Sequence, residues 1–201
     1  NAMGSTMLSN LSSTNLRALS STQISALTST ALAGLSSTQA PLLQTAQVRS
    51  LSTAQLASLS SQVFGALSST QIQSLSSTQV SGISTTMAAN MGTDQLTALT
   101  TAQLAYLDTA DLQALSSDQV KALGTDQLAA LSVGQIQSLE TQDFQALGTT
   151  KITALSAVHI RNMETADLAA LTSAQMAKLN TDQVGAISAT GLAARGTTQV
   201  G

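Results

Sequence analysis

An eight-residue period runs through this chain without a break and constrains its fold more than any other feature. Residues 3–194 of the 201 form 24 consecutive octads with no insertion or deletion, of which 19–26 and 67–74 are typical. A short fixed period means that one small structural unit is stacked many times. We therefore expect a single solenoid over residues 3–194, a frayed partial repeat over 195–201, and a cloning scar at residues 1–2.

The columns of the octad predict where a helix begins. With Leu11 as position one, positions one and six are apolar in all 24 octads. Position two is mostly Ser or Thr, and position five is Gln in 13 octads and Asp in three. A Ser or Thr N-cap followed three residues later by Gln is a capping box, and positions one and six stand where a hydrophobic staple is found. We expect one helix of about six residues per octad.

Charged residues follow the same frame. All ten acids lie at positions two, four or five, in the first turn of the predicted helices. Bases gather at position seven, near the predicted C-termini, as the helix dipole favours. Lys151 and His159 deviate from this pattern, because they stand at position five, which is otherwise mostly Gln. We expect His159 to act there as a side chain of the helix cap. Pro41 falls inside a predicted helix and should distort it.

Two other folds compete with the stack of short helices. In one continuous helix each octad would advance about 80° past two full turns, so the apolar seam would circle the helix. A β-solenoid is the rival, since short Ser- and Thr-rich repeats form such coils, but positions one and six would lie on opposite faces of a strand. We expect an all-α superhelical solenoid, with three octads in each coil because two would require a near-reversal of the chain.

Composition argues against several classes of function. Charged residues make up 8% of the chain and the net charge is −3. The chain has no run of basic residues that could bind a nucleic acid, so we expect no nucleic-acid partner. No apolar run approaches the length of a membrane-spanning helix, so we expect no membrane insertion. Cysteine is absent, and no nucleophile–base pair, phosphate loop or metal cluster is recognisable, so we expect no enzyme activity, cofactor or metal. One cation hypothesis stays open: Glu140 and Glu164 would stack if three octads make a coil.

A binding surface, if the array has one, should lie in the variable position-seven column. A partner protein or a glycan would meet side chains there on adjacent octads. Regular Ser and Thr columns at positions three and four suggest ice or mineral surfaces as a further alternative. Uncapped end coils also predict end-to-end self-association. The candidate position-seven residues are Arg17, Arg49, Gln73, Lys121, Gln137, Gln145 and Arg161.

Octads such as Leu51-Ser-Thr-Ala-Gln-Leu-Ala-Ser58 resemble repeat tracts of very large bacterial surface or secreted proteins of the adhesion or haem-utilisation type. The resemblance covers residues 3–201 and implies an extracellular array without an activity of its own. It carries over no binding residue, and haem ligation finds little support because His159 is the only histidine and cysteine is absent. A structural spacer or stalk is the leading hypothesis, with a binding solenoid as the alternative.

Overall fold

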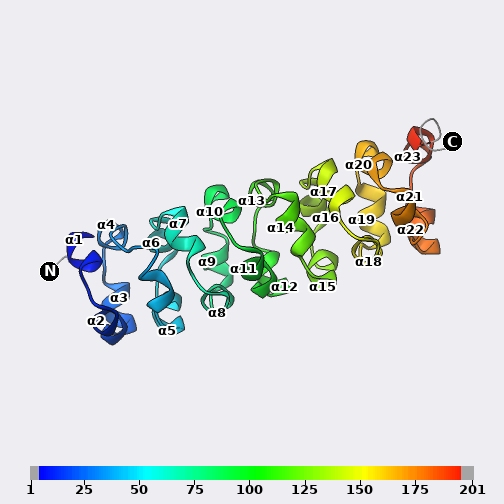
Figure 1. Cartoon of the computed structure of the whole chain (residues 1–201). Helices are drawn as coiled ribbons and strands as arrows, with labels where there is room; N and C mark the ends of the chain where they lie inside the picture. Colours follow the sequence, from blue (N-terminus) through cyan, green and yellow to red (C-terminus); the bar gives the residue numbers. More distant parts are fainter. Residues whose placement is uncertain (1–4, 196–201) are drawn as a thin grey trace. The chain divides into compact units, whose positions relative to one another are not determined.

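The computed structural model describes residues 5–195, and this part of the chain is built from short helices (Figure 1). It contains α-helices of four to seven residues and one 3-10 helix, and no strand lies within residues 5–195. The all-helical prediction is therefore confirmed over these residues, and the β-solenoid is not the fold that they adopt. The chain divides into two compact units, residues 1–107 and 108–201. A single solenoid across both units stays a prediction.

Each octad of the first unit carries one helix. The helices begin at position three of the octad and end at positions six to eight. They are α1 (Ser5–Ser9), α2 (Ser13–Ala18), α3 (Ser21–Ser25), α4 (Ser29–Leu32), η1 (Ala40–Leu42), α5 (Thr45–Arg49), α6 (Thr53–Ala57), α7 (Ser61–Gly65), α8 (Ser69–Gln73), α9 (Ser77–Val80), α10 (Thr85–Ala89), α11 (Thr93–Ala98) and α12 (Thr101–Leu104). The 3-10 helix η1 is the exception to this frame, because Pro41 lies inside it and the helix begins at position six.

The second unit keeps the same frame, except that α23 ends at position one of the following octad. Its helices are α13 (Thr109–Gln113), α14 (Ser117–Ala122), α15 (Thr125–Ala129), α16 (Val133–Gln137), α17 (Thr141–Ala146), α18 (Thr149–Ile152), α19 (Ala157–Asn162), α20 (Thr165–Ala170), α21 (Ser173–Met176), α22 (Thr181–Ala186) and α23 (Ala189–Arg195). None of the helices within residues 5–195 is long and apolar enough to cross a membrane.

Three octads form one coil in each unit. Helices that pack closely lie three octads apart: in the first unit α1, α4, α6, α9 and α12 follow one another in a column, as do α3, α5, α8 and α11. In the second unit the columns are α13, α16, α19 and α22; α14, α17, α20 and α23; and α15, α18 and α21. The predicted coil of three octads is confirmed within each unit.

The capping box and the staple form as the sequence predicts. In α6 the hydroxyl of Ser52 accepts a hydrogen bond from the Gln55 backbone N–H at 3.2 Å. The Ser52 backbone N–H donates in return to Oε1 of Gln55 at 2.8 Å. Leu51 at position one and Leu56 at position six are both buried. Since such a short helix is unstable in water on its own, this burial between coils supplies the stability that the helix lacks.

Candidate functional site

Position five carries the least expected feature of the structure, a set of buried glutamines. Gln71 is 2% exposed, and its Oε1 accepts the backbone N–H of Ser68 at 2.7 Å, as a capping box requires. Its Nε2 points the other way and donates to the backbone carbonyls of Ala40 at 2.9 Å and Leu43 at 2.6 Å. One amide therefore caps its own helix and also binds the preceding coil.

The same geometry recurs along the chain, and we call it the glutamine ladder. In each case Nε2 donates to carbonyls 31 and 28 residues earlier, at the end of a helix in the preceding coil and at the corner that follows it. Buried carbonyls that lack a partner are costly, so these bonds stabilise the stack. The members whose bonds lie within one unit are Gln39, Gln47, Gln55, Gln71, Gln79, Gln95, Gln103, Gln175 and Gln183.

Sequence reasoning assigned the position-five glutamines to the capping box alone and missed the donors that couple the coils. A signal for them is present in the same column. Glu completes a capping box as well as Gln does, yet no octad has Glu at position five. Gln differs from its acidic isostere Glu in having a donor as well as an acceptor, so the preference for Gln over Glu indicates that the donor is used in the octads that carry Gln.

Lys151 and His159, which break the sequence pattern, both keep the donor. Nζ of Lys151 donates to the carbonyl of Lys121 in the preceding coil. Nδ1 of His159 accepts the Ser156 backbone N–H at 3.2 Å, while the ring also bonds to the backbone of Leu131 in the preceding coil. The imidazole therefore caps its own helix and bonds to one of the two backbone positions that a ladder glutamine would reach, and it must be neutral to do so. Burial lowers its pKa, and the bond to Leu131 opposes that shift.

Aspartate at position five couples the coils in the opposite direction. Oδ1 of Asp143 accepts from the Ser117 hydroxyl at 2.6 Å, and Oδ1 of Asp167 accepts from the Thr141 hydroxyl at 2.8 Å. Each donor stands at position three in the preceding coil, 26 residues earlier. Burial raises the pKa of Asp167, and the Thr141 hydroxyl opposes that rise. Burial first, and the neighbouring Asp108 carboxylate second, raise the pKa of Asp111 to about 6.

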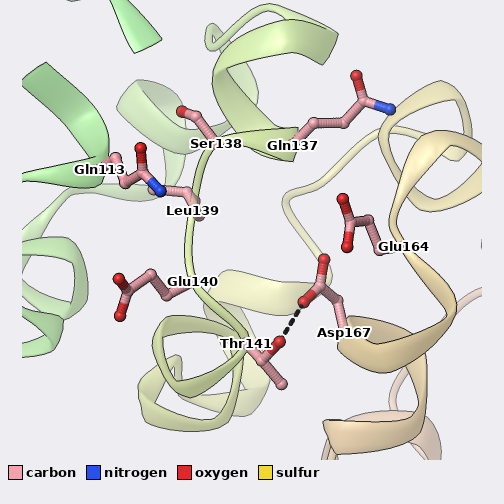
Figure 2. A pocket seen from close by; sticks show the side chains of 8 residues that line it. All are labelled: Gln113, Gln137, Ser138, Leu139, Glu140, Thr141, Glu164 and Asp167. Carbon is pink, nitrogen blue, oxygen red and sulfur yellow. Dashed lines mark hydrogen bonds between the residues drawn. The ribbon is translucent and has the colours of Figure 1, made fainter. Parts of the chain in front are cut away.

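A hollow of about 290 Å³ opens beside Asp167 in the second unit (Figure 2). A ladder glutamine at this place would donate to the carbonyl of Leu139 in the preceding coil. The shorter Asp167 bonds to Thr141 instead, and both Asp167 and Leu139 line the hollow. The other lining residues are Gln113, Gln137, Ser138, Thr141, Glu140 and Glu164, so three carboxyl groups and no base surround it.

Glu140 and Glu164 lie on consecutive coils, as the sequence predicted, and both line this hollow. They do not form a recognisable ligand set: within the described residues no three His, Cys, Asp or Glu side chains gather in a way that could hold a metal ion. Asp167 is 3% exposed and already bonded to Thr141. The geometry shows a polar hollow with an acidic rim.

The candidate position-seven residues are all exposed, and within each unit they lie on more than one column of helices. Within a unit they make three stacked pairs: Arg49 with Gln73 on α5 and α8, Lys121 with Gln145 on α14 and α17, and Gln137 with Arg161 on α16 and α19. Arg17 lies apart on α2. A role for them in binding a partner stays a prediction.

Two of these side chains also hold the coils together. Nε of Arg17 donates to the carbonyl of Leu42 at 3.0 Å, and Nε2 of Gln137 donates to the carbonyl of Asn162 at 2.9 Å. Both acceptors lie 25 residues later, at position eight of the following coil. Arg17 and Gln137 therefore add bonds between coils from position seven.

Comparison with known proteins identifies a repeat tract. A family model described as the ALTTAQ repeat matches residues 104–141 and 160–197, which together make up less than half of the chain. No curated protein matches the chain. The two matches confirm the short-repeat character that the sequence predicted, and the same octad frame continues outside them.

Proposed function

We propose that this chain is a non-catalytic structural array that serves as a spacer or stalk. One observation carries the proposal: within the described residues the buried polar side chains all stand at position five, and they form bonds within and between coils. Such an array adds length by adding coils, because each coil contacts only its neighbours. The match to a repeat family supports a structural repeat tract.

We further propose that the array belongs to a large bacterial surface or secreted protein and faces the outside of the cell. The support is the resemblance of octads such as 51–58 to repeat tracts of such proteins. In this setting the partners would be the domains that the array separates, or a protein or surface that the distal domains reach. Nucleic acid binding and membrane insertion form no part of the proposal.

Duplication of one coil tests the spacer function. Residues 51–74 span three octads, and a second copy inserted after residue 74 keeps the octad frame. Each added coil should lengthen the molecule by about one helix-packing distance, roughly 8–10 Å, with no loss of helical content. Small-angle X-ray scattering of chains with one, two and three extra coils measures this. The matched control inserts the same segment in scrambled order.

A linear increase of the maximum dimension with coil number, absent from the scrambled control, supports the spacer. A chain that stays the same length as coils are added overturns it. Location is tested separately: an antibody raised against this segment is used after protease treatment of intact cells. Release of a reactive fragment supports the surface location, and a signal that stays protected inside the cells contradicts it.

A further inference from the structure

Two octads of the second unit carry apolar residues where the array otherwise carries hydroxyls. Position three is Ser or Thr in 21 of the 24 octads, and the exceptions are Val133, Ala157 and Ala189. Val133 and Ala157 stand on α16 and α19, which pack against each other in consecutive coils. The residues that follow them at position four are Gly134 and Val158. Two of the three departures from the hydroxyl column therefore lie on neighbouring helices.

A hydroxyl at position three binds the following coil elsewhere in the array. Oγ of Ser21 donates to the carbonyl of Ala46 at 3.2 Å, and Thr53 makes the same bond to position four of its following coil, 25 residues later. Val158 stands at this spacing from Val133, but a valine side chain cannot donate. Val133 thus gives up a bond between coils. Stacking of the coils does not account for this residue, which indicates a role on the outer surface.

The four residues form an uneven apolar surface. Val158 is 51% exposed, Gly134 is exposed, and Val133 and Ala157 are half-buried. A Cβ on Gly134 would meet nothing within 4 Å, so the space beside its backbone is open. We call Val133, Gly134, Ala157 and Val158 the apolar face. It presents a protruding valine on α19 beside a glycine on α16 that leaves room for a side chain.

Charge is absent from positions three and four along this part of the column. On α13, α16 and α19 these positions carry no charged residue, and α13 continues the face with Ala110. Elsewhere in the unit position four includes Asp118, Asp126 and Asp182. A second identical surface could therefore approach the apolar face without repulsion between like charges. Burial of the exposed apolar area would favour that contact.

We propose that the apolar face binds the same face of a second copy of the chain in a two-fold dimer. When two such faces meet with their helices antiparallel, Val158 of each copy lies over Gly134 of the other. The contact is isologous and closes on itself, so it gives a dimer. It is small, so its dissociation constant should be on the order of 10–100 μM. This lateral pairing goes beyond the spacer function and does not depend on it.

Sedimentation velocity of the full chain, from well below to well above that dissociation constant, tests the proposal. The wild type should show a monomer–dimer equilibrium. Val158→Glu and Gly134→Lys should each weaken the dimer at least about tenfold, because each places a charge where the contact excludes water. Both positions are exposed, so circular dichroism should show unchanged helical content. The matched control is Ala174→Glu, at exposed position four of α21 in another column of the same unit; it should dimerise like the wild type.

A mixture of the two charged variants tests which residues meet. In the mixed dimer Gly134 of one variant meets Val158 of the other, and the new carboxylate opposes the new ammonium group. A one-to-one mixture of Val158→Glu and Gly134→Lys should therefore dimerise more strongly than either variant alone. A monomeric wild type, a Val158→Glu chain that associates like the wild type, loss of the dimer in Ala174→Glu, or a mixture with no recovery would overturn the proposal.

Discussion

Replacement of Gln71 by Glu removes the ladder donor and changes almost nothing else. Glu has the same shape as Gln, and its carboxyl oxygen can still accept the Ser68 backbone N–H. In the wild type, Nε2 of Gln71 lies 2.9 Å from the carbonyl oxygen of Ala40 and 2.6 Å from that of Leu43. In the variant the second carboxyl oxygen takes the place of Nε2 and faces both carbonyl oxygens without a proton to donate. The variant thus separates the two functions of the position-five side chain, helix capping and coil coupling.

The loss follows from the two bonds. Each buried hydrogen bond is worth about 1 kcal/mol, so Gln71→Glu should lower the free energy of unfolding by about 2 kcal/mol, and by more while the carboxylate is ionised. Burial beside two carbonyl oxygens raises the pKa of the new carboxyl above its unfolded value of about 4.3. A group with a raised folded pKa is stabilising below its unfolded pKa. The loss should therefore shrink to about 1 kcal/mol as pH falls from about 7 to about 4, because the protonated acid donates one bond.

Gln73→Glu is the matched control. Gln73 lies on the same helix, α8, but its side chain is exposed at position seven, so the same charge change should alter stability by less than about 0.5 kcal/mol. Urea unfolding followed by far-UV circular dichroism at both pH values gives the two differences from the wild type. Equal effects of the two substitutions, or a Gln71→Glu loss that does not change with pH, would refute the claim that the Gln71 donor couples the coils.

Three further predictions follow from single residues. Burial lowers the pKa of His159, so the free energy of unfolding should fall as pH drops below about 6.5, and His159→Gln should remove that part of the pH dependence measured by urea unfolding. The pKa of Asp111 is raised to about 6, so stability should rise as pH falls from 6 toward the unfolded value of 3.8, and Asp111→Asn should flatten that slope in the same assay. A Cβ on Gly65 would lie 2.8 Å from the carbonyl oxygen of Asn90, whereas one on Gly134 would meet nothing within 4 Å. In thermal melts Gly65→Ala should therefore cost about 1–3 kcal/mol and Gly134→Ala should gain about 0.5–1 kcal/mol; a gain at Gly65 would contradict the close approach.

The sequence predicts the features that are written in local order along the octad. Ser52 and Gln55 form the capping box, and Leu51 and Leu56 are buried, because each of these interactions involves positions within a single octad. The coil of three octads follows from how sharply a chain can turn at positions one and two. These features fix the fold without knowledge of which side chains meet between coils.

The candidate site depends on contacts between consecutive coils, and the octad alone does not reveal them. Nε2 of Gln47 donates to the carbonyls of Leu16 and Leu19 in the preceding coil. Whether it can reach them depends on the distance between consecutive coils, which the octad does not encode locally. The hollow beside Asp167 arises where the Asp side chain, which is shorter than Gln, bonds to Thr141 and does not reach the carbonyl of Leu139. Composition marks the column as polar, but the direction of its bonds emerges only when the coils are stacked.

The ladder also explains how helices this short persist. The amide of Gln47 holds the first turn of its own helix through Oε1 and the end of a helix in the preceding coil through Nε2, so unfolding one coil removes donors from another coil's carbonyls. Coupling between neighbours then exceeds the stability of any single helix, which is the condition for a cooperative array. In the octads of Asp143 and Asp167, the position-five side chain accepts one hydrogen bond from a hydroxyl of the preceding coil, and burial of its carboxyl group is costly. The array should therefore open first at these octads, although the octad frame passes through them unchanged.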